Sequence, residues 1–274
     1  MIWLCSYPKS GNTWARIMFV LAQRGGDVDL NTLVSQLTDY SPWEADRKWF
    51  DQVSGKDWSQ MNGVSILANR QKAQAAMEAA HGPDALVKSH NMVATPQGVP
   101  LFPAGDTHRA VHVVRNPLDV AVSLKHHMGM KEEVIVRIMT NADMIARRTK
   151  TCVWEKYGSW RTHTESWLNQ APYPTFHLRY EDLAEHKVNI LGNALAHAGM
   201  ELGADRVQGL LDGTAITNLQ AAEDKVGFDE IQSALTNFFR AGKTGAWKQE
   251  LSAEARTKIL ADCQPLMDHF GFEY

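Results

Sequence analysis

Residues 2–21, IWLCSYPKSGNTWARIMFVL, decide the fold of this chain. Residues 2–7 form a short apolar run of the kind that builds a buried strand, and Pro8 and Gly11 then interrupt it. After the interruption, large apolar residues recur at helical spacing, at Trp14, Ile17, Met18 and Leu21. The stretch therefore predicts a strand, a tight loop and a helix.

The loop between these two elements has the composition of an anion-binding site. Backbone N–H groups at a helix start are unpaired and point in one direction, and the helix dipole adds positive potential there. Gly11 permits a close approach of the backbone to a ligand, Asn12 and Thr13 carry side-chain donors, and Lys9 adds a full positive charge. Because the lysine precedes the glycine, the loop is not the nucleotide-binding G-x-x-x-x-G-K-[ST] motif. Taken alone, it is also compatible with an ordinary turn that carries a solvated lysine.

A second candidate anion site lies between residues 109 and 131. This segment sets four basic residues against one acid: Arg109, Arg115, Lys125 and Lys131 against Asp119. Arg115 directly follows an apolar run, and Ser123 falls on the same side of the helix that Asn116 and Pro117 begin. Arg115 and Ser123 could therefore hold one phosphate, with a solvated basic patch as the alternative.

The rest of the chain alternates strands with helices. Short apolar runs predict further strands at residues 85–88, 110–114 and 175–178. Helical periodicity predicts a long helix over about residues 131–157, one around Leu191 and Leu195, and a last one from near Ser252. This order indicates an α/β fold with a mostly parallel central sheet flanked by helices on both faces, and ligands of such sheets bind at the carboxyl ends of the strands.

Two segments break the regular pattern. Residues 40–63 are rich in tryptophan, and residues 91–109 are rich in proline and glycine. Long irregular connections inside a compact domain commonly form binding loops, so a second substrate is expected to bind there.

The composition limits the class of protein. With 274 residues, of which 44% are hydrophobic, residues 1–274 are expected to form a single domain. A formal net charge of −3 argues against a nucleic-acid partner. The three cysteines are far apart and lack metal-ligand spacing, which fits a reducing compartment. No apolar window suggests a signal peptide or membrane insertion, so a cytoplasmic protein is expected.

Five motifs resemble those of the cytosolic-type sulfotransferases, which move a sulfuryl group from 3′-phosphoadenosine 5′-phosphosulfate (PAPS) to a hydroxyl or an amine. In chain order they are YPKSGNTW, LVKSH, VVRNPLDVAVSLKHH, LRYEDL and FFRAGKTGAWK, and they span residues 7–248. The first turn also resembles loops of bacterial members of the family. The resemblance implies a sulfotransferase with PAPS as its donor and adenosine 3′,5′-bisphosphate (PAP) as its product.

The resemblance also implies how the donor is bound. The first motif would bind the phosphosulfate and the adenosine side through Lys9, Ser10, Gly11, Asn12, Thr13 and Trp14. Arg115 and Ser123 would bind the 3′-phosphate, Tyr180 would approach the adenine, and Arg240 and Gly242 would close over the 3′-phosphate. The family's usual Arg-Lys-Gly reads Arg240-Ala241-Gly242 here, which leaves Lys243 as a candidate for the missing charge.

For the chemistry, the resemblance makes His90 the general base, with Lys9 neutralising the leaving phosphate and Lys88 stabilising the transferring group. It implies no metal. The tryptophan-rich segment favours an apolar or aromatic small molecule as the acceptor, and the oligomeric state stays open. Two alternatives remain: a nucleotide-dependent kinase, with Glu181 and Asp182 as candidate magnesium ligands, and a nucleotide-binding protein without catalysis.

Overall fold

The computed structural model describes residues 1–274 except residues 26, 57–59, 104, 106–107, 231–236 and 241. Its centre is a sheet of parallel strands in the order β2-β1-β3-β6. The strands are β1 (Ile2–Ser6), β2 (Leu86–Ser89), β3 (Arg109–Val114) and β6 (Thr175–Arg179). Each lies within a residue or two of its prediction, and the predicted mostly parallel sheet is confirmed.

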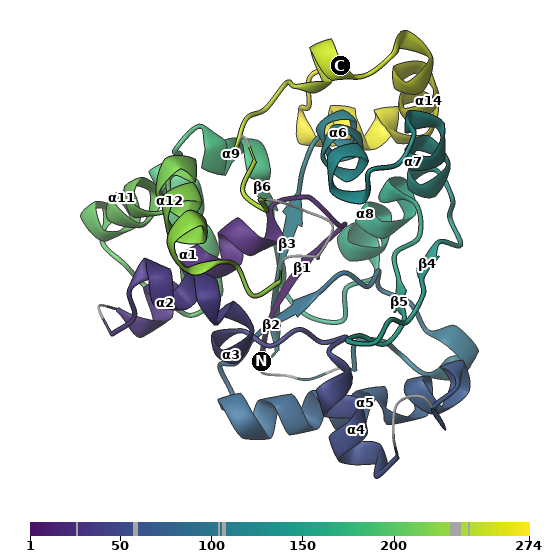
Figure 1. The fold of residues 1–274 in the computed structure, drawn as a ribbon, viewed down its shortest axis with the longest axis vertical. Helices are drawn as coiled ribbons and strands as arrows, with labels where there is room; N and C mark the ends of the chain where they lie inside the picture. Colours follow the sequence, from purple (N-terminus) through teal and green to yellow (C-terminus); the bar gives the residue numbers. More distant parts are fainter. Residues whose placement is uncertain (26, 57–59, 104, 106–107, 231–236, 241) are drawn as a thin grey trace.

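Both faces of the sheet are covered, and this explains why its strands are apolar without alternation. In β1, Ile2 and Leu4 belong to one core cluster, whereas Trp3 and Cys5 belong to another on the opposite face. Figure 1 shows the sheet between two groups of helices. The first group is α1 (Asn12–Arg24), α2 (Leu30–Ser35), α10 (Val188–His197), α11 (Ala204–Gly213) and α12 (Ile216–Val226).

The second group covers the other face in two parts. One part packs around Trp3 and contains α4 (Arg47–Ser54), α5 (Gly63–His81) and α8 (Trp160–Asn169). The other part contains α6 (Pro117–Met128), α7 (Glu132–Met139), α13 (Trp247–Glu250) and α14 (Ala253–Phe270). The described residues also form the short helices α3 (Leu37–Tyr40), η2 (Pro96–Gly98) and α9 (Tyr180–Ala184). None of the helices in the described ranges has the length and apolar character needed to cross a membrane.

The predicted helix starts are confirmed where capping residues mark them. Asn116 caps α6 by accepting a hydrogen bond from the N–H of Leu118, and Pro117 occupies the first helical position. Ser252 caps α14 by accepting from the N–H of Ala255. These signals are local, so the sequence was sufficient to locate them.

The predicted long helix over residues 131–157 is wrong. Helix α7 ends at Met139, and the chain then turns into two short antiparallel strands, β4 (Ile145–Ala146) and β5 (Glu155–Lys156). The Asn141 side chain accepts a hydrogen bond from the N–H of Asp143, which stabilises the turn in place of another helical residue. The apolar residues after the turn are spaced as in a helix, but they do not form one.

The irregular segments also contain more structure than expected. Residues 40–63 include helix α4, whose Trp49 and Phe50 are buried in the core, while Trp58 lies outside the described residues. Helix α5 has no clear apolar stripe, because alanine and glutamine fill much of its length and Arg70 and Gln74 are among its buried residues. Hydrophobic periodicity could not reveal it.

Candidate active site

The strand-to-helix loop after β1 is held in an unusual backbone conformation. Lys9 and Gly11 both have positive φ angles, of 67° and 97°. A Cβ atom on Gly11 would lie 2.4 Å from the ring of Tyr180, so only glycine fits there. The loop leads directly into the start of α1, where Asn12 and Thr13 are buried.

Two polar side chains of this loop lack complete partners. The hydroxyl of buried Ser10 has no hydrogen-bond partner among the described residues. The Asn12 side-chain nitrogen donates to the carbonyl of Leu4 at 2.9 Å. The Asn12 side-chain oxygen has no hydrogen-bond partner among the described residues. Asn12 therefore anchors the loop to β1, and Ser10 keeps a free donor. An unpaired buried hydroxyl at a helix start fits a phosphate-type ligand.

Lys9 brings a perturbed cation to the loop. Its Nζ lies 4.2 Å from the centre of the Phe238 ring. Burial, followed by the charges of Lys88 and Arg115, lowers the pKa of Lys9 to about 8. Such crowding of positive charge is typical of a site that an anionic ligand neutralises.

Lys88 lies in the neighbouring strand and is only 7% exposed. Its Nζ is 2.8 Å from Oε2 of Glu230 and 4.7 Å from the centre of the Trp43 ring. The other carboxylate oxygen of Glu230 is 2.6 Å from the guanidinium of buried Arg16. Although burial alone would raise it, the cations Arg16 and Lys88 hold the pKa of Glu230 well below its usual value. Nothing in the sequence near Glu230 indicated that its carboxylate would pair with both Lys88 and Arg16.

His90 follows β2 and has a defined tautomer. Its Nδ1 lies 2.9 Å from the carbonyl oxygen of Ser6 at the end of β1. Since a carbonyl can only accept, Nδ1 carries the proton and Nε2 keeps its lone pair. Burial, and then the charge of Lys88, lowers the pKa of His90 to about 3. The imidazole is therefore neutral and can accept a proton at Nε2.

Arg115 joins the loop after β1 to a late segment of the chain. Its guanidinium donates to the carbonyls of Lys9, at 3.3 Å, and Lys243, at 3.1 Å. It also stacks 4.3 Å from the centre of the Tyr180 ring, and Tyr180 meets Trp14 edge-on at 5.7 Å. Three of the predicted donor-binding residues, namely Gly11, Trp14 and Arg115, thus contact a fourth, Tyr180.

The late segment is fastened to helix α6 by Asp119, a buried acid. One carboxylate oxygen accepts from the N–H of Gly245 at 2.7 Å, and the other accepts from the N–H of Trp247 at 3.2 Å. In the sequence, Asp119 stands out only as the single acid of a basic segment. Its position in the first turn of α6, three residues after the cap, could have suggested a structural role.

The remaining predicted residues are less firmly tied to the site. Ser123 is half-buried two turns along α6. Arg240 is exposed and lies 3.6 Å from Glu250. Gly242 has a positive φ of 60° and packs against Ile216, and Lys243 is exposed. Ala241 lies outside the described residues, so the substitution in the family's Arg-Lys-Gly stays untested.

The acids of the kinase alternative are engaged inside the protein. Glu181 accepts a hydrogen bond from the N–H of Asn116 at 3.0 Å, and Asp182 lies 2.7 Å from Nζ of Lys187. Among the residues that the structure describes, no three His, Cys, Asp or Glu side chains are grouped so that they could hold a metal ion.

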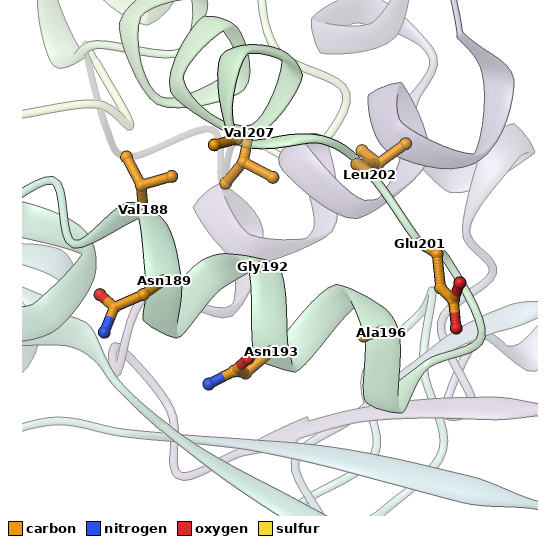
Figure 2. A pocket seen from close by; sticks show the side chains of 9 residues that line it. Val188, Asn189, Gly192, Asn193, Ala196, Glu201, Leu202 and Val207 are labelled. Carbon is orange, nitrogen blue, oxygen red and sulfur yellow. The ribbon is translucent and has the colours of Figure 1, made fainter.

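A separate surface hollow of about 320 Å³ lies between α10 and α11. Figure 2 shows Asn193 and Gly192 along one side and Val207 and Leu202 along the other. None of the predicted site residues lines this hollow, and it offers a single charged side chain, Glu201. It lacks the basic character of the loop after β1.

Comparisons with known proteins agree with this picture. A family model described as "Sulfotransferase domain" matches residues 1–271. The chain is 23% identical over 283 residues to sulfotransferase 1A1 of Canis lupus familiaris, covering 99% of this chain and 84% of that protein. It is 24% identical over 270 residues to sulfotransferase 2A6 of Mus musculus, covering 94% and 82%.

Solved structures give the same fold. One is retinol dehydratase in a complex with retinol and PAP, with a TM-score of 0.65 and 16% identity over 100% of this chain and 82% of that chain. Another is mouse sulfotransferase SULT7A1 complexed with PAP, with a TM-score of 0.60 and 17% identity over 96% and 84%.

Proposed function

This chain belongs to the sulfotransferase family, and on that premise we propose that it transfers a sulfuryl group from PAPS to a hydroxyl or an amine of a small-molecule acceptor. The observation that carries the proposal is the convergence of Lys9, Lys88 and His90 at the carboxyl ends of β1 and β2. That edge of a parallel sheet is where ligands bind. We treat residues 1–274 as one sulfotransferase domain.

In this proposal, the donor is bound between the loop after β1 and the segment that Arg115 reaches. The N–H groups at the start of α1, the free hydroxyl of Ser10, Thr13 and Lys9 bind the phosphosulfate, with Asn12 holding the loop in place. Tyr180 and Trp14 contact the adenosine. The 3′-phosphate is bound by Arg115, Ser123, Arg240, Gly242 and Lys243. The titles of the solved sulfotransferase neighbours, which name PAP, support this choice of donor.

The chemical step needs one base and two cations. The acceptor oxygen or nitrogen attacks sulfur, the bond from sulfur to the 5′-phosphate oxygen breaks, and the acceptor proton passes to Nε2 of His90. Lys9 neutralises the charge that grows on the leaving phosphate, and Lys88 stabilises the sulfuryl oxygens. An anionic donor beside His90 raises the pKa of the imidazole from its low value without ligand, which improves it as a base.

The acceptor is proposed to be apolar or aromatic. Two half-buried aromatic side chains flank the reactive groups: Trp43 beside Lys88, and Tyr157 with its ring centre 6.2 Å from that of His90. Trp49 and Phe50 do not contribute, because they pack in the core.

The three cysteines are free thiols, which supports a cytoplasmic site of action.

The first test is donor binding and turnover. We expect the purified protein to bind PAP by calorimetry and to transfer label from PAPS to members of a panel of phenols, alcohols, amines and glycosides. Lys9→Ala and His90→Ala should each abolish turnover, and His90→Ala should still bind PAP because the imidazole acts on the acceptor. Two exposed residues provide matched controls, Lys72→Ala and His269→Ala.

Other outcomes would point to the alternatives. Loss of PAP binding in His90→Ala would contradict the role of the base. Transfer of phosphate from ATP in place of sulfate from PAPS would indicate a kinase. PAP binding without transfer to any acceptor in the panel would favour a binding protein.

A further inference from the structure

A buried carboxyl group beside the proposed base has no part in the reaction described so far. Glu155 in β5 is 1% exposed. Its Oε1 accepts hydrogen bonds from the backbone N–H of His90 at 2.9 Å and from the indole N–H of Trp43 at 3.3 Å. Its Oε2 lies 3.4 Å from the hydroxyl of Tyr157. One side chain thus contacts the base and both aromatic residues that flank the reactive groups.

The backbone around Glu155 keeps this carboxyl group in place. The N–H of Lys156 donates to the side-chain oxygen of Asn91 at 2.7 Å, and the N–H of Met92 donates to the carbonyl of Lys156 at 2.8 Å. Strand β5 is therefore tied to the residues that directly follow His90. These hydrogen bonds keep the two backbone segments together. A change in the charge or shape of the Glu155 side chain should therefore alter the position of the His90 backbone.

The surroundings of Glu155 shift its pKa from the acidic range to near neutral pH. Burial and the negative charge of Glu44 raise the pKa of Glu155 to about 7, against the hydrogen bond from the His90 N–H and the charges of Lys88 and Arg70. The titratable and charged groups that face it are Cys5, Glu44, Arg70, Lys88, His90, Cys152 and Tyr157. Glu44 is already bound by Arg70, Gln74 and Asn91. Glu155 is therefore expected to change its charge as the pH crosses neutrality.

We propose that Glu155 is a positioning residue for sulfuryl transfer: its ionised carboxylate holds the backbone of His90 and the indole of Trp43, and so aligns the base with the acceptor. The inference rests on the proposed function. A carboxylate accepts stronger hydrogen bonds from these two N–H groups than a neutral carboxyl group does. Its negative charge also stabilises the imidazolium that forms when His90 takes the acceptor proton. The ionised form should therefore be the active one.

The test is the pH profile of kcat/KM for the acceptor at saturating PAPS. The native enzyme should gain activity from pH 6 to pH 8 with a midpoint near neutrality. Because a bound donor also raises the pKa of His90, the loss of this midpoint in Glu155→Gln is what assigns it to Glu155. Glu155→Gln keeps the shape and one acceptor oxygen but cannot ionise. It should lower kcat/KM at pH 8 by about 10- to 100-fold, remove this midpoint, and leave PAP affinity unchanged.

Three further variants sharpen the result. Tyr157→Phe should keep the midpoint, because it leaves the contact to His90 intact. Trp43→Phe should raise KM for the acceptor more than it lowers kcat. Glu165→Gln, on the exposed side of α8, is the matched control and should behave as the native enzyme. A carbon-13 NMR titration of the native protein reports the ionisation of Glu155 without any substitution.

The outcomes separate this inference from the proposed function. If the native protein neither binds PAP nor turns over, the proposed function fails and the inference fails with it. If the native protein turns over and Glu155→Gln retains both the native rate and the midpoint, the inference alone is overturned. A titration midpoint for Glu155 well below pH 6 would also overturn it.

Discussion

At the scale of single residues, the charge of Lys9 should decide how strongly the proposed site binds PAP. Lysine ordinarily stays protonated to a pKa of 10.5, but burial and the neighbouring cations Lys88 and Arg115 lower the value here to about 8. The ammonium form is therefore present below pH 8 and is lost as the pH rises through that value. A bound phosphosulfate would reverse part of this shift, because it neutralises the same cations.

We therefore expect PAP affinity to fall between pH 8 and pH 10, as Lys9 loses its proton. Lys9→Arg should bind PAP more weakly at pH 7 but with little change over the same range, because a guanidinium stays charged. Calorimetry across this range measures both effects. An alkaline loss of affinity that persists in Lys9→Arg would mean that another group is responsible.

At the scale of elements, helix α6 serves two functions with adjacent residues. Asn116 and Pro117 start the helix, while Asp119 in its first turn accepts the N–H groups of Gly245 and Trp247. The helix therefore carries the segment after residue 241 to the end of β3, where Arg115 meets the carbonyl of Lys243. Asp119 thus holds the late segment beside Arg115, at the proposed donor site.

Asp119→Ala should loosen that segment and weaken PAP binding, while α6 persists because its cap is unchanged. Each buried N–H group left without a partner costs about 1–3 kcal/mol, so the free energy of unfolding should also fall. Calorimetry and thermal unfolding measure the two losses. Glu133→Ala, an exposed acid in the first turn of α7, is the control and should change neither. Unaltered PAP affinity in Asp119→Ala would show that the segment has no part in donor binding.

At the scale of the whole molecule, a buried ion pair joins helix α5 to the sheet. Nη1 of Arg70 lies 2.6 Å from Glu44, and its Nη2 donates to the carbonyl of Trp154 at 2.7 Å. Glu44 also accepts from the side chain of Asn91, next to His90. The pair therefore holds helix α5, at the bottom of Figure 1, in place relative to the end of β2.

Arg70→Met should destabilise the protein by about 3–5 kcal/mol, because it leaves the Glu44 carboxylate buried without its partner. The double variant Arg70→Met/Glu44→Leu should recover much of that loss, since no uncompensated charge remains. Urea unfolding of the two single variants and the double variant gives the coupling energy. Additive losses would contradict the assignment of the pair as one unit.

The sequence predicted the features that depend on neighbours along the chain. An apolar run followed by Pro8 and Gly11 predicts a strand that ends in a tight loop. Asn116 and Pro117 predict a helix start from their own capping chemistry, independently of distant residues. The same local logic failed after Met139, because periodicity alone could not weigh a helix against the Asn141 turn and the pairing of β4 with β5.

Only the tertiary structure decided which distant side chains meet. Glu230 reaches Lys88 across 142 positions, and Glu155 reaches His90 across 65. Such contacts follow from how helices and strands pack, and no local pattern of residues records that packing. The sequence by itself thus determined the strands of the sheet, the loop after β1 and the helix starts that capping residues mark, whereas packing determined the ionisation of Lys9 and Glu155 and the tautomer of His90.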